Sequence, residues 1–145
     1  MAIPTPAFGS GASWAGEYAP IGMNAGYGFG RAGAKDGLLV GVEASYVRNL
    51  DNLVWYGAYS DGVYDRSAAE ARLSLGPEFG WMFLGIDGGY LVAIGKERVE
   101  HGFTVRPMLT TGVVTLYARG GVLLTGAEDR FAEVGALVKW PLWKG

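Results

Sequence analysis

A period-two alternation of apolar and polar residues, running from about residue 20 to residue 141, constrains this chain more than any other feature. Successive side chains of a β-strand point to opposite faces of its sheet, so this alternation predicts strands rather than helices. The links between the alternating segments are short and carry turn residues, so consecutive strands must be antiparallel hairpin partners. The eight predicted strands cover residues 20–30, 37–48, 53–64, 70–81, 84–94, 97–109, 113–124 and 130–141.

The two faces of these segments differ sharply in charge. Outside the third segment and away from the segment ends, one face carries no Asp, Glu, Lys or Arg, and His101 is its only side chain that titrates near neutral pH. The opposite face carries five acidic and five basic residues among many glycines, and they are Glu43, Arg72, Glu78, Asp87, Arg98, Glu100, Arg106, Arg119, Glu133 and Lys139. The third segment is ambiguous, because both of its faces carry aromatic residues.

Two barrel architectures are compatible with such faces. In a soluble ligand-binding barrel the apolar face would point inward, and the outer face would be glycine-rich, although a glycine on an exposed strand weakens it without any packing return. In a membrane barrel the apolar face meets lipid, and paired charges among small residues fill the narrow lumen. We therefore predict an all-β, eight-stranded, antiparallel up-and-down transmembrane β-barrel, with the soluble barrel as an alternative.

Composition and length are consistent with one barrel domain. The chain has 145 residues and 50% hydrophobic residues, and no apolar run approaches the roughly 18 residues of a membrane helix. Residues 1–19 are predicted to be an irregular N-terminal lead-in, and residues 20–145 to form the barrel. The N-terminus lacks a basic start followed by an apolar stretch. On the membrane interpretation, we expect that a secretory signal peptide has been removed.

Aromatic residues cluster near the predicted strand ends, where tryptophan and tyrosine favour the lipid headgroup region. The expected membrane-interface aromatics are Tyr27, Tyr46, Trp55, Trp81, Trp140 and Trp143. Residues 133–140 place a polar residue, a glycine and two hydrophobic residues at a spacing that resembles the C-terminal signal of outer-membrane barrels. The chain departs from that signal after Trp140, where Pro141-Leu142-Trp143-Lys144-Gly145 replaces the usual terminal aromatic.

Together, residues 20–143 resemble the small eight-stranded outer-membrane barrels of the OmpA and OmpX type. The resemblance implies a place in the bacterial outer membrane. It also implies membrane lipids and the outer-membrane assembly machinery as partners. Another envelope protein is a further possible partner, which the aromatic rim or the tail after Pro141 would contact.

Several other functional classes are excluded by composition. The net charge of −2 and the absence of a basic stripe indicate no nucleic-acid partner. The chain has no cysteine and one histidine, and its carboxylates are spread over different strands, so we expect no metal site and no cofactor. The glycine-rich run at 26–30 has no following helix, which argues against a nucleotide-phosphate site.

We predict no catalytic residue. Some small outer-membrane barrels are lipid A acyl-modifying enzymes that use a serine and a histidine, and His101 lies near a rim on the predicted lipid face. The serines, however, lie on other predicted strands, and a catalytic serine needs a base within hydrogen-bond reach. The lumen should be filled, and the outward links near 31–36, 61–70, 95–97 and 126–130 are short. The sequence therefore favours a non-enzymatic barrel that stabilises the envelope or docks a partner, with the lipid A enzyme as an alternative.

Overall fold

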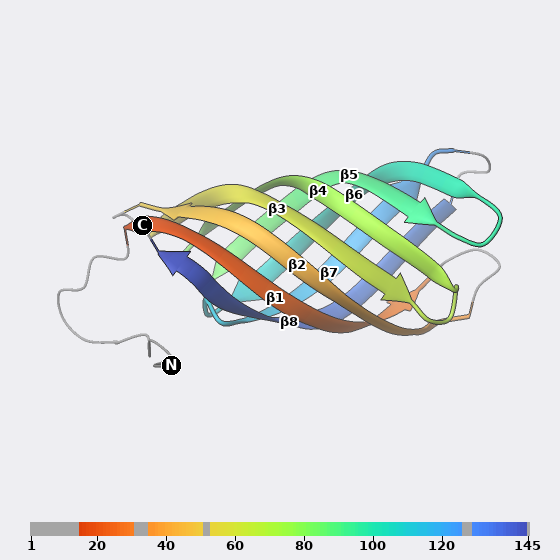
Figure 1. Cartoon of the computed structure of the whole chain (residues 1–145), viewed down its shortest axis with the longest axis horizontal. Coiled ribbons are helices and arrows are strands. Elements are labelled where there is room, and N and C mark those ends of the chain that lie inside the picture. The colour runs from red at the N-terminus through yellow and green to blue at the C-terminus, as the bar shows by residue number, and fades with distance from the viewer. Residues whose placement is uncertain (1–14, 31–34, 51–52, 126–128, 145) are drawn as a thin grey trace.

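Eight antiparallel strands close into a barrel in the computed structural model, which describes residues 15–30, 35–50, 53–125 and 129–144, with only the backbone of residues 143 and 144. Each strand pairs with its neighbours in sequence, and β1 pairs with β8 to close the ring (Figure 1). The strands are β1 (Gly16–Phe29), β2 (Gly37–Asn49), β3 (Val54–Asp65), β4 (Glu70–Trp81), β5 (Leu84–Ile94), β6 (Val99–Thr110), β7 (Val114–Leu123) and β8 (Asp129–Lys144). The expected all-β, eight-stranded antiparallel barrel is confirmed.

The two ends of the barrel are defined by the chain's connections. The start of β1 and the end of β8 lie at one end, together with the β2–β3, β4–β5 and β6–β7 turns; we call this the terminal rim (Figure 1). The other four connections lie at the opposite end, which we call the distal rim. Residues 1–14 of the expected lead-in lie outside the described residues, as do 31–34 and 126–128 of the expected links.

The seam between β1 and β8 extends further than the sequence predicted. β1 begins at Gly16, so residues 16–19 belong to the strand rather than to a lead-in, and β8 continues past Pro141. Pro20 lies opposite Pro141, and the register shifts between Ala19 and Pro20. Because proline cannot donate to a strand ladder, its presence in both segments concealed the strand ends in the sequence.

The β3–β4 connection is shorter than the expected link at 61–70. Only residues 66–69 separate the two strands, and Asp65 belongs to β3 and Glu70 to β4. The Asp65 carboxylate accepts hydrogen bonds from the backbone N–H groups of Ser67 and Ala68, both at 3.0 Å. Such an Asx-type turn lets four residues reverse the chain, so the charged residues beside it lie in the strands.

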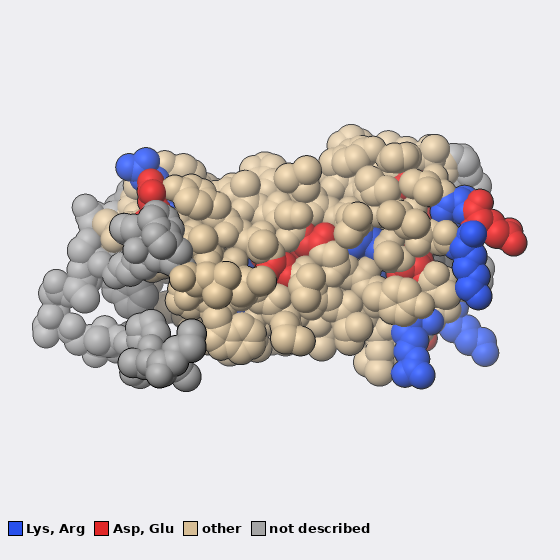
Figure 2. Space-filling model, viewed as in Figure 1, with Lys and Arg blue, Asp and Glu red and all other residues tan. Residues whose placement is uncertain are grey.

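The strand faces are arranged with the apolar side chains outside. Along β6, exposed and buried side chains alternate without interruption. On β4, Leu73 and Leu75 point outward and are exposed, whereas Arg72 and Ser74 point inward and are buried. Figure 2 shows a broad tan wall with charged side chains gathered at the two rims, and a strip of charged atoms visible between side chains of the wall. The charged face of the alternation therefore lines the lumen.

Candidate functional site

Arg106 forms the centre of a charged cluster that fills the lumen. It lies on β6 and is completely buried. Its Nη1 is 2.6 Å from Glu43 Oε2 on β2, and its Nη2 is 2.5 Å from Asp87 Oδ2 on β5. The Arg106 Nε also donates to Asp87 Oδ2 at 2.6 Å. One guanidinium therefore joins its neighbouring strand to a strand across the barrel through charge-assisted contacts with two carboxylates.

Two further arginines extend this cluster towards the distal rim. Arg119 Nη2 hydrogen-bonds to Asp61 Oδ2, and its Nη1 is 3.3 Å from Glu133 Oε1. Arg72 Nη2 is 3.2 Å from Glu133 Oε2 and 3.4 Å from Asp65 Oδ2. The Glu133 carboxylate thus bridges two arginines from different strands, and the ion pairs form one continuous network.

Lys139 extends the network towards the terminal rim. Its Nζ is 2.5 Å from Glu43 Oε1, and it donates to Ser45 Oγ at 3.1 Å. Glu78 is more loosely held, since its Oε2 is 3.7 Å from the same Nζ. Glu78 also lies opposite Asp87 in the β4–β5 register, so two carboxylates face each other on the inner wall.

The sequence prediction of the interior charges was wrong for Arg98. Arg98 precedes β6, and its side chain is 64% exposed, although its Nε lies 3.5 Å from the buried Glu100. The other nine predicted interior residues are buried in the lumen.

Four buried acids were missed, because the sequence placed them in surface links; they are Asp61, Asp65, Glu70 and Asp129. Asp61 matters most of these, since it also contacts Ser74 and lies 3.8 Å from Arg106 Nη1.

These corrections change the expected charge balance of the lumen. Among the described residues, four cationic side chains are buried, and they are Arg72, Arg106, Arg119 and Lys139. The buried carboxylates are more numerous: Glu43, Asp61, Asp65, Glu70, Glu78, Asp87, Glu100, Asp129 and Glu133. The lumen is therefore acid-rich, rather than balanced as the sequence suggested.

An apolar cluster closes the lumen on the side of the terminal rim. It consists of Met108, Tyr117 and Leu137, with Trp55 packed against them. Trp55 was expected at the membrane interface, but its indole lies inside the barrel and its Nε1 donates to the Met82 carbonyl at 3.4 Å. The sequence could not place Trp55, because both faces of β3 carry aromatic side chains.

A second apolar cluster lies towards the distal rim and consists of Leu91, Ala93, Leu123 and Phe131. The guanidinium of Arg72 stacks on the Phe131 ring, with its Cζ 4.4 Å from the ring centroid. Arg106 similarly lies 5.1 Å from the centroid of Tyr59. Apolar and aromatic side chains therefore contact the charged network, and the low local dielectric that they create strengthens its ion pairs.

The remaining predicted interface aromatics point outward. Tyr46, Trp81 and Trp140 lie on the outer face near the terminal rim, and Tyr27 lies near the distal rim, each about half exposed. Trp143 belongs to β8, but its side chain lies outside the described residues.

His101 lies on the outer face of β6, near the distal rim. Its ring Nδ1 is hydrogen-bonded to the Tyr90 hydroxyl, and its backbone N–H donates to Thr125 Oγ1 at 2.7 Å. Ser45 and Ser74 are buried in the lumen, on the other side of the wall from this imidazole. The side chain that hydrogen-bonds to the His101 ring is thus a tyrosine. Within the described part of the chain, no serine hydrogen-bonds to this ring, as lipid A chemistry would require. The same part contains no cluster of three or more potential metal ligands.

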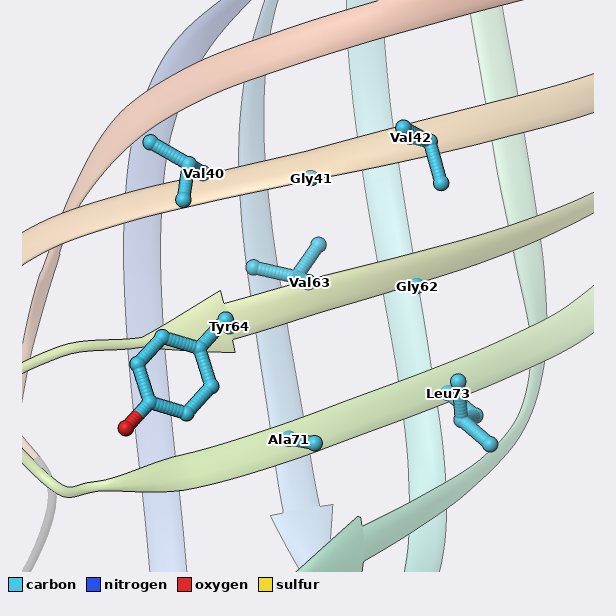
Figure 3. Close-up of a pocket in the computed structure, with 8 residues that line it drawn as sticks. All are labelled: Val40, Gly41, Val42, Gly62, Val63, Tyr64, Ala71 and Leu73. Carbon is cyan, nitrogen blue, oxygen red and sulfur yellow. The ribbon is translucent and has the colours of Figure 1, made fainter.

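The outer wall carries a shallow apolar hollow of about 300 Å³ over β2, β3 and β4 (Figure 3). Gly62, an outward-facing residue without a side chain, leaves space between taller neighbours. Val42 and Leu73 border the hollow on one side, and Val40 and Tyr64 border it on the side of the distal rim (Figure 3). This hollow was not predicted from the sequence, because the alternation distinguishes the two faces of a strand but not the shape of the surface that they form.

Together, the fold and these sites define a class: a closed antiparallel barrel with a charged, acid-rich lumen and an apolar outer wall. No helix among the described residues has the length and hydropathy needed to cross a membrane. Comparisons with protein-family models, with curated proteins and with solved structures found no match.

Proposed function

We propose that this chain is an integral β-barrel of the bacterial outer membrane, with a non-enzymatic role in stabilising the envelope or docking another envelope protein. The outward apolar wall carries the proposal. Leu38, Leu75 and Phe103 are each more than half exposed, on three different strands. Monomeric soluble proteins rarely expose contiguous apolar patches beyond a few hundred Å², whereas lipid would cover such a wall favourably.

Closure of the sheet supports the same proposal. In hydrocarbon every backbone polar group needs a partner within the protein, and a barrel without edges meets that condition. Hydrogen-bonded pairing runs around the whole ring, from β1 to β8 and back to β1. Outward aromatics near both rims, such as Trp81 and Tyr27, suit the two headgroup regions.

The lumen supports a structural role over transport. Its charged side chains pair with one another, and apolar clusters lie on both sides of the network. An eight-stranded interior is just wide enough for side chains to fill, so solutes have no path. The proposed partners are membrane lipids, the assembly machinery that would recognise β8, and an envelope protein that would contact the wall or an aromatic rim.

The decisive experiment is reconstitution of the purified, urea-unfolded chain into phosphatidylcholine vesicles. We expect β-sheet circular dichroism to appear only with vesicles or detergent, and the folded strands to resist added protease. As a control, protease is added before the vesicles, and we expect the chain to be digested because it has not yet folded into a membrane. Folding in plain buffer to a monodisperse monomer would contradict the proposal and restore the soluble barrel.

A further inference from the structure

Two exposed basic side chains lie together at the distal rim, where β2 and β3 meet. Lys35 precedes Gly37 by two residues, and Arg66 follows β3 directly. A Cβ built on Gly37 would lie only 1.6 Å from Ser67 Oγ, and the Arg66 backbone N–H donates to the Leu38 carbonyl at 3.3 Å. These contacts hold the start of β2 against the β3–β4 turn, so Lys35, two residues before Gly37, and Arg66, next to Ser67, lie on the same part of the rim.

Neither cation is neutralised by a described acidic neighbour. Lys35 and Arg66 make no ion pair with another described residue. Asp65 is buried and already accepts from the β3–β4 turn and from Arg72. The exposed Asp36 accepts a hydrogen bond from the Gly30 N–H at 3.4 Å. Lys35 and Arg66 therefore bring two positive charges against the one exposed carboxylate of Asp36, so the described part of this rim position carries a net positive charge.

The apolar hollow lies on the same strands, below these cations. Val40 is paired with Tyr64. Val40 lies two residues from Leu38, and Tyr64 lies two residues from Arg66. Gly62 lies a further two residues from Arg66 along β3. A strand rises about 3.3 Å per residue, so Gly62 lies roughly 13 Å from Arg66 along the wall. The headgroup region is about 5–8 Å thick on each side of the hydrocarbon core. A phosphate at the cations would thus place the hollow among acyl chains.

We propose that this surface binds one anionic phospholipid, with its phosphate at Lys35 and Arg66 and one acyl chain in the hollow over β2–β4. The inference rests on the proposed membrane location and adds to it a specific lipid site. The positive charges of Lys35 and Arg66 would select an anionic headgroup, and the small residues Gly62 and Ala71 leave space that an acyl chain would fill. The Tyr64 hydroxyl points towards the side where β3 and β4 join, so its ring separates the polar and apolar parts of the site (Figure 3).

The site is tested by native mass spectrometry of the barrel released from mixed micelles of phosphatidylglycerol and phosphatidylcholine. We expect the wild-type chain to retain one phosphatidylglycerol in preference to phosphatidylcholine by about thirtyfold, from two basic contacts. K35Q/R66Q should abolish the preference. A71L, which fills the hollow, should lower retention of both lipids.

Matched controls separate a site from general attraction. R48Q/K96Q removes the same charge from other exposed positions, and A118L adds the same bulk to the outer face of β7, and both should behave as wild type. No phosphatidylglycerol preference in the wild type, an equal loss of preference in both charge pairs, or a dimer in place of bound lipid would each overturn the inference. Failure to fold in phosphatidylcholine vesicles alone would instead refute the proposed membrane location, so the two failures are distinguishable.

Discussion

At the scale of single residues, Arg106 is the side chain on which the lumen depends most. It contacts Glu43 and Asp87 at 2.6 Å or less, from β2 and β5, and it also lies against Tyr59 and Tyr117. A buried ion pair adds little net stability compared with a well-packed apolar replacement, but removing one member strands the other charge. We therefore expect that the network affects the free energy of unfolding mainly when one of its members is removed.

Replacing Arg106 with leucine should lower the free energy of unfolding by about 3–5 kcal/mol, because Glu43 and Asp87 lose their cation inside the barrel. Urea titration of the barrel in vesicles, followed by circular dichroism, measures this difference. The matched control is Arg48→Leu, which removes an exposed arginine near the terminal rim and should change stability by no more than about 0.5 kcal/mol. Equal losses in the two variants would mean that the lumen network is not buried as described.

At the scale of elements, the strands pack because inward glycines leave room for long inward side chains. A Cβ built on Gly80 of β4 would lie 2.1 Å from the Trp55 ring, and one on Gly121 of β7 would lie 2.3 Å from Phe131. Gly26 and Gly135 similarly accommodate the Tyr117 hydroxyl. The high glycine content therefore reflects packing inside the lumen.

Gly80→Ala should accordingly destabilise the barrel by about 1–3 kcal/mol, because the Trp55 indole must move within a filled interior. Gly120→Ala on β7 is the comparison, since a Cβ there meets nothing within 4 Å, and it should be neutral or stabilising by up to about 1 kcal/mol. The same urea titration reports both values, and the tryptophan fluorescence of the folded chain should shift only in the Gly80 variant. A tolerated Gly80→Ala would argue against Trp55 filling the lumen.

The alternation predicted the faces of most strands because the side-chain period of a strand is two and a one-residue error reverses the whole pattern. It failed for β3, where Trp55 and Tyr59 face inward while Tyr56 and Tyr64 face outward, so no contrast marked the lumen. Charges at strand ends were also ambiguous, because an aspartate such as Asp65 suits both a turn and a buried ion pair. The ion-pair partners across the lumen, such as Glu43 for Arg106, depend on how the barrel closes. The alternation within each strand therefore could not predict them.

At the scale of the whole molecule, the barrel is an apolar wall around an interior that holds charged and apolar side chains. Part of the charged network lies between the cluster containing Trp55 and the cluster containing Phe131, whereas Glu100 and Asp129 lie beside the second cluster, opposite Ala93 and Leu123. An ion crossing the lumen would have to displace apolar side chains at both levels and also break paired charges. We therefore expect that the acid-rich interior does not form a permeation path.

In planar bilayers, the reconstituted protein should give no stable conductance steps in salt, because its side chains fill the lumen. A known channel-forming barrel, added under the same conditions, provides the positive control. Stable steps that scale with salt concentration would show that the interior opens to water and would redirect the functional proposal towards transport.

The seam between β1 and β8 has a consequence for how the barrel can be built. Seven of the strand pairings join neighbours along the chain, whereas this one pairs Gly22 with Lys139 and Tyr18 with Lys144. The two ends of the domain therefore lie one strand spacing apart, about 4.8 Å, and a short linker could join them as an additional hairpin. A circular permutant opened at any other turn would keep the same sheet and the same lumen. The proline-interrupted seam would then become an internal corner, and the two strands beside the new opening would become the first and the last.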